Sequence, residues 1–332
     1  MTGEKQISTA ILETLLDQRE NRVERGFYWE NQIAFAYNSE KMEGSPLSER
    51  QTRTIFETRT LSTGGPVPVD SIIEASNQFR LFDRVLDTVE EPLTQELVKE
   101  FHRVLKTGTA DEDRGQGGAG GYKTVPNAVD GIIASAPDAV PEELERLFAA
   151  YRRNPSPTIR DIAGLHVFFE RIHPFQDGNG RVGRAIAFRE CLAHGIAPFI
   201  VLDETKDRYY DGLRRFSEEP EVLVEYFEDM QERYLEAFAG LIPDSRIRNA
   251  RLVEDLDEYR SRDPFVQTLE EYFCQGMEEE DFDGEPVEET FSAAEESARA
   301  RNESRRMERG GLFASMARKL AKRAKGREDD PI

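Results

Sequence analysis

Apolar residues recur at intervals of three or four positions through most of the first 240 residues, which is the spacing of helices with one buried face. This pattern predicts helices before residue 60 and over about residues 71–86, with a loop over 61–68 between them. Three further helices are predicted: from Pro92 past Leu105, from Pro141 to Tyr151, and from Thr158 to Ile172. The chain is therefore expected to be mainly α-helical, with a core over roughly residues 20–250.

Two internal stretches do not follow the helical spacing. Residues 107–121 are rich in glycine and charge, which predicts a loop, and residues 122–140 hold short β-prone pieces, which predicts a hairpin or extended flap. From Glu278 the chain is acidic, and after Arg301 it becomes basic with apolar residues on one helical face. We expect a linker and a solvated tail there, with docking to a partner or a membrane surface as the alternative.

Composition narrows the class of protein. The 332 residues include 44 lysines and arginines against 65 aspartates and glutamates, so the net charge is −21. A chain this acidic repels a phosphate backbone, which argues against sequence-independent nucleic-acid binding. Cys191 and Cys274 lie far apart and indicate neither a disulfide scaffold nor a structural zinc site. Since no apolar run approaches the ~20 residues of a membrane span and no signal-peptide core is present, we expect a cytoplasmic protein without transmembrane contact.

Residues 173–184, with the sequence HPFQDGNGRVGR, stand apart from the helical pattern. Pro174 disfavours helix at the residue before it, so the preceding helix is predicted to end by His173. The glycines allow a tight turn and a close approach to a ligand, and a new helix is predicted to follow and to end near Gly195. A glycine-rich turn that opens a helix directs N–H groups and the positive end of the dipole outward, which predicts an anion site.

The charged residues of this segment indicate which anion it binds. Arg181 lies four residues before Ala185 on the apolar stripe of the second helix, where a guanidinium needs an anionic partner. Arg184 follows one turn later, so both side chains can reach the predicted anion site, and two arginines suit several phosphate groups. Asp177 offers one carboxylate, as is common where Mg²⁺ is held beside phosphates, and His173 suits proton transfer near neutral pH. The set predicts a nucleotide phosphate chain, a magnesium ion and a base.

The segment resembles the signature of Fic-domain proteins, H-P-F-x-[D/E]-G-N-G-R followed by a second arginine, and meets every fixed position. The resemblance covers roughly residues 90–245. It implies a mainly α fold, a Fic-type helical bundle core with a short β-hairpin flap over the active site. It assigns residues 1–90 to an N-terminal helical region, 91–245 to the Fic domain and 246–332 to a charged, partly disordered helical tail.

The resemblance implies protein adenylylation (AMPylation), a nucleotidyltransferase reaction in which AMP passes from ATP to a Ser, Thr or Tyr hydroxyl and diphosphate leaves. On this interpretation His173 is the catalytic base and Asp177 holds Mg²⁺. The residues implied in ATP binding are Gly178, Asn179, Gly180, Arg181, Arg184, Tyr209 and Tyr210, the two tyrosines at the adenine. The residues implied in target docking form the flap: Tyr122, Lys123, Thr124, Val125 and Pro126. Gly180 and Arg184 favour AMP transfer over the phosphate transfer of the related Doc kinases, which have lysine in place of the second glycine and lack the second arginine.

A second motif lies upstream, where residues 39–44 read SEKMEG and resemble the family's inhibitory helix, [S/T]-x-x-x-E-[G/N]. Glu43 is predicted in the last turn of a helix that Gly44 stops, and a carboxylate there faces the negative end of the dipole. It would be better placed with a cationic partner, which the resemblance implies is Arg184. Ser39, Glu43 and Gly44 are therefore the predicted inhibitory residues, and a Glu43–Arg184 pair would leave ATP unproductive.

Two alternatives to AMP transfer stay open. Glu43 could position a water so that the same site removes AMP from a modified protein, or the pocket could bind nucleotide only to regulate docking of partners. ATP is the expected small-molecule partner, the protein target is unknown, self-modification is expected, and the family allows a homodimer. His102, His166 and His194 show no ligand spacing and are predicted to be structural.

Overall fold

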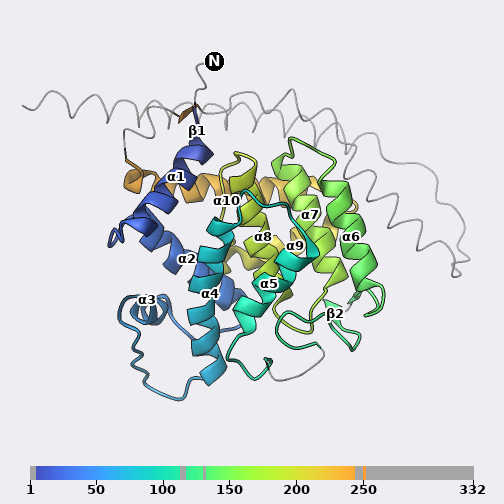
Figure 1. The fold of residues 1–332 in the computed structure, drawn as a ribbon, viewed down its shortest axis with the longest axis horizontal. Helices are drawn as coiled ribbons and strands as arrows, with labels where there is room; N and C mark the ends of the chain where they lie inside the picture. Colours follow the sequence, from blue (N-terminus) through green and yellow to red (C-terminus); the bar gives the residue numbers. More distant parts are fainter. Residues whose placement is uncertain (1–4, 113–116, 130–131, 244–249, 252–332) are drawn as a thin grey trace, which may run out of the picture.

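The computed structural model describes residues 5–112, 117–129, 132–243 and 250–251, and within them the chain is a bundle of ten α-helices (Figure 1). The helices are α1 (Ile7–Glu20), α2 (Phe27–Met42), α3 (Glu49–Thr58), α4 (Val69–Asp87), α5 (Gln95–Lys106), α6 (Val140–Tyr151), α7 (Ile159–Ile172), α8 (Asn179–Ala193), α9 (Lys206–Arg215) and α10 (Glu221–Phe238). Two short 3₁₀ helices, η1 (Asp203–Thr205) and η2 (Ala239–Leu241), precede α9 and follow α10. The prediction of a mainly helical chain is confirmed.

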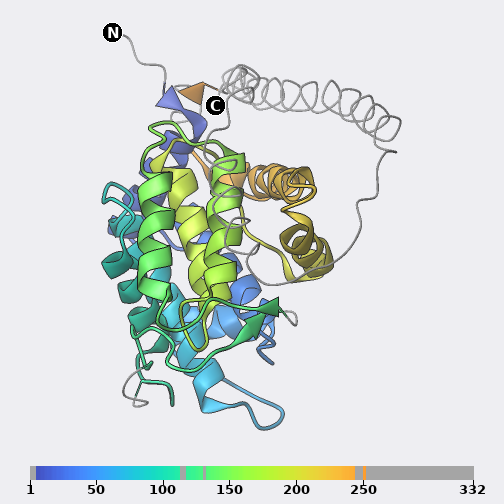
Figure 2. The same ribbon diagram turned by 90° about the vertical axis from the view of Figure 1, so that its right-hand side faces the viewer.

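Helix α8 lies in the middle of the bundle (Figures 1 and 2). It packs against α7 and also meets α1, α2, α4 and α5. Nearly all of its residues are buried, including Arg181 and Arg184, which lie one turn apart. Because several helices surround α8, these two guanidinium groups need their partners inside the protein.

The ends of the helices follow the local sequence. The Thr158 side chain accepts a hydrogen bond from the N–H of Asp161, and the Asp161 carboxylate accepts one from the Thr158 N–H, so the two residues cap the start of α7. Helix α7 ends at Ile172, as predicted, and His173 follows in the left-handed conformation with a φ of 50°. Helix α8 then begins at Asn179, within the segment where the sequence predicted a new helix.

Two predicted limits differ from the structure. The core begins before residue 20, because Ala10, Ile11 and Leu15 of α1 are completely buried. The helix itself lies in the region before residue 60 that was predicted to be helical, and only the limit of the core was placed too late. Helix α5 begins three residues after Pro92, because the Thr94 side chain caps it.

Four strands of two residues each complete the described fold. Strand β1 (Lys5–Gln6) pairs in parallel with β4 (Ala250–Arg251), and β2 (Ala128–Val129) pairs antiparallel with β3 (Ile132–Ile133). Figure 2 shows the β2–β3 pair at one end of the bundle, inside the segment predicted to form a hairpin or flap. With only two residues paired on each side, a flap over the active site stays a prediction.

Part of the predicted organisation, the acidic stretch from Glu278 and the basic helix after Arg301, lies outside the described residues. Among the residues that are described, no helix has both the length and the apolar character that crossing a membrane requires.

Candidate functional site

The predicted anion turn joins α7 to α8, and one asparagine closes it. The side chain of Asn179 accepts a hydrogen bond from the N–H of Phe175 (2.8 Å) and donates one to the Phe175 carbonyl (2.8 Å). Asn127, from the segment before β2, donates to the same carbonyl (3.0 Å). Gly178 caps α8 with a φ of 83°, a conformation that favours glycine. The turn is therefore fixed both from within and from the predicted flap segment.

The first turn of α8 carries the predicted phosphate contacts. The N–H groups that begin an α-helix have no partner within the helix and lie at the positive end of its dipole. Gly180 lies in this turn, and a Cβ added there would be 2.6 Å from Glu43 Oε1 and 2.9 Å from Arg184 Nη1. Glycine is therefore the residue that permits Glu43 and Arg184 to meet over the helix start.

His173 lies beside the turn with its ring partly buried. Its Nδ1 is 3.2 Å from the Glu170 carbonyl oxygen. Because a carbonyl only accepts, Nδ1 carries the hydrogen and Nε2 is left as an acceptor. Burial lowers the pKa of His173, and Lys123 acts in the same direction. A neutral imidazole with an unprotonated Nε2 is the form that can take up a proton.

The carboxylate of Asp177 is ionised and accessible. Its side chain is 53% exposed, and its Oδ2 contacts Arg181 Nη2 (2.9 Å) and Lys106 Nζ. Partial burial acts to raise the pKa of Asp177, but Arg181 and Lys106 lower it to about 2. An ionised carboxylate that solvent reaches has the donor chemistry that Mg²⁺ prefers, so the residues present fit the predicted metal.

The end of α2 holds Arg184. The guanidinium Nη2 donates to Glu43 Oε1 (2.7 Å) and to the Ser39 carbonyl (2.9 Å), and Nε donates to the Ser39 hydroxyl (3.2 Å). Burial acts to raise the pKa of Glu43, but Arg184 holds it below its ordinary value. Gly44 follows with a φ of 84° where the helix stops. The structure thus brings Ser39 and Glu43, two of the residues predicted to be inhibitory, together with Arg184, and inhibition itself stays a prediction.

Arg181 meets three carboxylates from three parts of the chain. Its Nη1 lies 2.8 Å from Glu74 Oε2 of α4 and 3.4 Å from Glu40 Oε2 of α2, and its Nη2 contacts Asp177. The side chain is almost completely buried, and its Nε finds no acceptor among the described residues. Burial acts to lower the pKa of Arg181, but Glu40 and Glu74 raise it, so the guanidinium stays charged.

A cavity of about 190 Å³ opens beside Arg181. Four carboxylates contribute to its walls, those of Glu40, Glu43, Glu74 and Asp177. A triphosphate would enter a space lined largely by negative charge, and both arginines that could receive it are already paired. The site therefore holds the groups needed to bind phosphates and to move a proton, in an arrangement that opposes the entry of an anion.

The two tyrosines predicted at the adenine occupy different positions. Tyr209 is 1% exposed, and its hydroxyl lies 2.6 Å from His166 Nε2 in the core. Tyr210 is half-buried, with its ring 5.2 Å from that of Tyr209. A ring as buried as Tyr209 has no face open for stacking on a base. Tyr210 is the better placed of the two, and its contact with adenine stays a prediction.

The predicted docking segment, residues 122–126, is attached to the anion turn. The backbone N–H of Lys123 donates to the Pro174 carbonyl (2.8 Å), and its ammonium donates to the Ile172 carbonyl (3.0 Å). Burial lowers the pKa of Lys123 to about 8. Val125 and its two neighbours are exposed. The segment therefore lies next to His173 with an accessible edge.

Three charged residues of the site were missed by the sequence analysis: Lys106, Glu40 and Glu74. Lys106 and Glu40 fall on the buried stripes of their helices, four residues after His102 and Ala36, and Glu74 is partly buried on α4; all three contact Arg181 or Asp177. A charged residue at a position where the spacing requires an apolar one is the signal that could have found them.

The remaining histidines make structural contacts. The Nδ1 of His102 accepts a hydrogen bond from the Gly120 N–H (2.9 Å), and its Nε2 lies 3.0 Å from the Asp177 carbonyl oxygen, so the ring supports the anion turn. His166 is completely enclosed, and burial lowers its pKa to about 3. His194 Nε2 lies 3.3 Å from Glu190 Oε2 at the end of α8.

The comparisons with known proteins all point to similarity with Fic proteins. Residues 92–190 match the Fic/DOC family. "Protein adenylyltransferase Fic" of Culex quinquefasciatus is 26% identical over 228 residues, which cover 67% of this chain and 44% of that protein. "Protein adenylyltransferase fic-1" of Caenorhabditis elegans is 27% identical over 189 residues, which cover 55% and 36%. The chain spans less than half the length of these curated relatives.

Solved structures share the fold. A Fic domain containing signaling protein from Bacteroides thetaiotaomicron superposes with a TM-score of 0.59 at 20% identity, covering 70% of this chain and 96% of that one. Fic-1 from C. elegans gives a TM-score of 0.53 at 22% identity, covering 69% and 71%. The residues that match the family include the whole turn from His173 to Arg184. Residues 92–190 are therefore similar to the Fic/DOC family, and the described fold is similar to that of solved Fic proteins.

Proposed function

We propose that this chain is a protein adenylyltransferase, which transfers AMP from ATP to a Ser, Thr or Tyr hydroxyl of a protein and holds itself inactive through Glu43. The names of the curated relatives support the class of reaction. One observation carries the proposal: the start of α8 gathers a neutral histidine, an ionised carboxylate and two buried arginines. These are the groups that phosphoryl-type transfer needs for positioning and charge stabilisation.

His173 would act as the base of this reaction. Its Nε2 accepts the proton of the target hydroxyl while the hydroxyl oxygen bonds to the α-phosphorus of ATP. The bond between the α-phosphorus and the oxygen that bridges to the β-phosphate breaks, and diphosphate leaves with the electron pair. The N–H groups of the first turn of α8 would stabilise the negative charge that develops.

Asp177 would hold Mg²⁺, and the two arginines would hold the outer phosphates. When bound, Mg²⁺ would supply positive charge that offsets the charge of the phosphates. Arg181 and Lys106 keep the Asp177 carboxylate ionised at every pH near neutrality. Arg181 and Arg184 present planar donor groups suited to bidentate binding of the β- and γ-phosphates.

The contact between Glu43 and Arg184 supports the inhibitory part of the proposal. A γ-phosphate would need the Nη2 group that Glu43 now occupies at 2.7 Å. The carboxylate walls of the neighbouring cavity add repulsion against the triphosphate. Removing the Glu43 side chain would leave Arg184 without its carboxylate partner, bonded to Ser39 of α2 and open to a phosphate.

The test is incubation with ATP labelled at the α-phosphate, followed by detection of label on the protein. Wild type is expected to label itself weakly and Glu43→Gly strongly, and His173→Ala in the Glu43→Gly background is expected not to label itself. Glu90→Gly, which changes an exposed glutamate in the turn after α4, is the matched control and should behave as wild type.

Two outcomes would contradict the proposal. If Glu43→Gly binds ATP but does not label itself, the proposed transferase activity is contradicted. Loss of AMP from a pre-modified protein, in wild type but not in Glu43→Gly, would identify hydrolysis as the main activity of the site.

The segment of residues 122–126 is the proposed docking surface for the target. Its backbone attachment to Pro174 and its exposed edge at Val125 would bring an extended peptide next to His173. Recognition through the backbone of an extended segment is a common way for proteins to bind peptides.

A further inference from the structure

Lys106, the last residue of α5, lies at the metal position proposed for Asp177. Its side chain is 1% exposed, so the ammonium is buried. Its Nζ lies 2.6 Å from Glu74 Oε1 and 2.9 Å from Asp111 Oδ2, and it also contacts Asp177 Oδ2. A buried ammonium with three carboxylate partners is fully occupied, which fixes its position.

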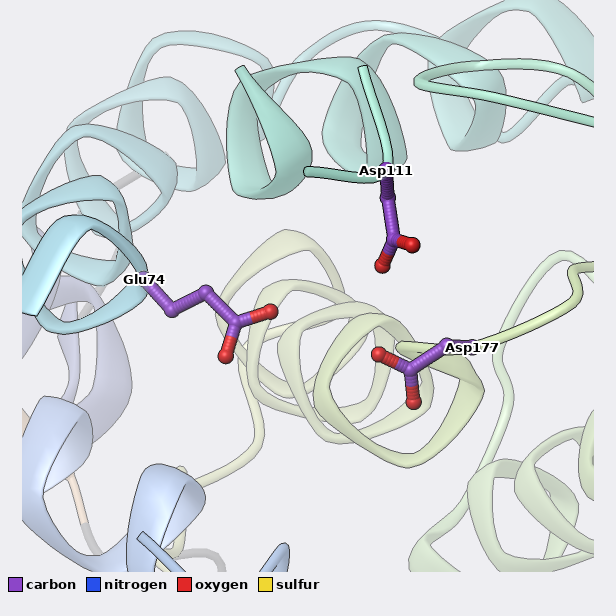
Figure 3. Close-up of side chains that lie close together, drawn as sticks. All are labelled: Glu74, Asp111 and Asp177. Atoms are coloured by element: carbon purple, nitrogen blue, oxygen red, sulfur yellow. The ribbon is translucent and has the colours of Figure 1, made fainter. Parts of the chain in front are cut away.

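The three carboxylates come from separate parts of the fold. Glu74 belongs to α4, Asp111 to the loop after α5 and Asp177 to the turn before α8, and Figure 3 shows them facing a common space. One oxygen of each lies within 4.8 Å of those of the others. Such oxygens could serve a divalent cation, but the ammonium of Lys106 already lies among them. Lys106 and a metal ion would therefore compete for the same oxygens.

The charges favour the lysine as long as no nucleotide is present. Asp177 Oδ2 also contacts Arg181, so a bare divalent cation at this carboxylate would meet two buried cations. A triphosphate carries negative charge of its own, which attracts Arg181 and Lys106 and leaves Asp177 available to the metal. Without Lys106, the site would lose the ammonium that contacts all three carboxylates, and a divalent cation would offset the excess negative charge.

We propose that Lys106 is a built-in counter-ion for Asp177 that prevents divalent metal from binding until ATP brings it. Metal and nucleotide then enter the site together, and Mg²⁺ alone does not load it. Lys106 acts through Asp177 and is a positioning residue. The inference rests on the proposed function only in taking Asp177 as the residue that holds the metal.

The test measures binding of Mn²⁺ to the full chain without nucleotide, from the EPR signal of unbound Mn²⁺. Wild type is expected to show no binding that depends on Asp177. Lys106→Met is expected to gain such binding, with an affinity at least about tenfold above the detection limit set by wild type, because one buried positive charge beside the metal is gone. Lys106→Gln keeps polar contacts to the carboxylates and provides a second variant if Lys106→Met does not fold.

Three controls separate this effect from general binding to an acidic protein. Adding Asp177→Asn to Lys106→Gln is expected to abolish the gained site. Lys106→Arg keeps the charge and should bind Mn²⁺ as wild type does. Lys99→Met removes a lysine of the same helix whose ammonium lies over the Tyr122 ring at 4.1 Å, and it should also behave as wild type.

The proposal is overturned if wild type binds Mn²⁺ at Asp177 as tightly as Lys106→Gln does, or if Lys106→Gln gains no Asp177-dependent binding. The measurement uses neither ATP nor a protein target. Its failure would therefore leave AMP transfer untouched, and failure of AMP transfer would leave the metal measurement valid.

Discussion

Arg181 and Arg184 lie one turn apart on the same buried helix, yet their surroundings differ. Among the described residues, Arg184 forms an ion pair with the carboxylate of Glu43, hydrogen bonds to Ser39 of α2, and also interacts with the Tyr209 hydroxyl. Arg181 pairs with three carboxylates, which belong to α2, α4 and the anion turn. The ion pair of Arg184 thus depends on the end of one helix, whereas the ion pairs of Arg181 come from three parts of the domain.

This difference implies that the two arginines respond unequally to the loss of one partner. A single substitution can release Arg184, because its charge depends on one carboxylate. The same change near Arg181 leaves two carboxylates in place. On the proposed function, the end of α2 would therefore be the point of control, and the Arg181 network would stay assembled.

The largest effect is expected from a change that touches neither arginine. His173→Ala, made in the Glu43→Gly background, should lower AMP transfer by about 10²- to 10⁴-fold, the usual contribution of a general base. Nucleotide affinity should stay within a few-fold, because both arginines remain. Labelled-AMP incorporation and calorimetric titration with ATP measure the two quantities, and equal losses in both would contradict a role confined to proton transfer.

A smaller effect is expected from the carboxylates of α2, and here the two arginines are compared directly. Glu43→Gly should raise self-modification by about 10- to 100-fold, as expected for ~1.4–3 kcal/mol of released pairing. Glu40→Gln should raise it less than about threefold, because Glu74 and Asp177 still hold Arg181. Equal increases in initial rate would show that the two arginines are controlled alike.

The close approach at Gly180 tests the Arg184 pair through stability. An added Cβ would lie 2.6 Å from Glu43 Oε1, so Gly180→Ala should displace this pair and lower the free energy of unfolding by about 1–3 kcal/mol. Gly64→Ala is the matched control, because nothing lies within 4 Å of a Cβ there. Denaturant unfolding measures both variants, and an equal response would mean that the turn adapts without cost.

The smallest expected effect is a change in the pH dependence of stability at Glu170, which interacts electrostatically with Arg184. Burial raises the pKa of Glu170 to about 8, although Arg184 acts to lower it. In the folded protein the Glu170 carboxyl therefore stays protonated, whereas in the unfolded chain it loses its proton above its ordinary pKa near 4.3. The free energy of unfolding therefore falls as pH rises from about 5 to 8. Glu170→Gln should remove this pH dependence, so between pH 5 and 8 its free energy of unfolding should rise by on the order of 1–2 kcal/mol relative to that of wild type.

Urea unfolding at several pH values checks this difference. Buried histidines such as His166, whose pKa is lowered, act in the opposite direction below about pH 6.5, so the comparison of variant with wild type isolates Glu170. A difference that stays constant from pH 5 to 8 would contradict a raised pKa at this carboxyl.

The sequence predicted what depends on local order. The end of α7 before His173, the start of α8 and the stop at Gly44 follow from proline, glycine and capping residues, and the structure has them where expected. The pairing of Glu43 with Arg184 joins residues 141 positions apart, so it came from family resemblance and from no local rule.

The rest of the site depends on tertiary packing. Lys106, Glu40 and Glu74 meet only because α2, α4 and α5 surround the start of α8, and periodicity within one helix does not encode which helices become neighbours. The burial of Tyr209 has the same origin, since its hydroxyl contacts His166 of another helix. Sequence spacing could have marked these residues as unusual, but it could not have named their partners.

Because α8 is enclosed by its neighbours, its first turn cannot shift without repacking of the core. On the proposed function, adaptation to different target proteins would therefore come from the surrounding loops and the exposed edge near Val125. If the proposed function holds, the phosphate-binding turn would stay constant while target recognition diverges through changes that never reach the interior.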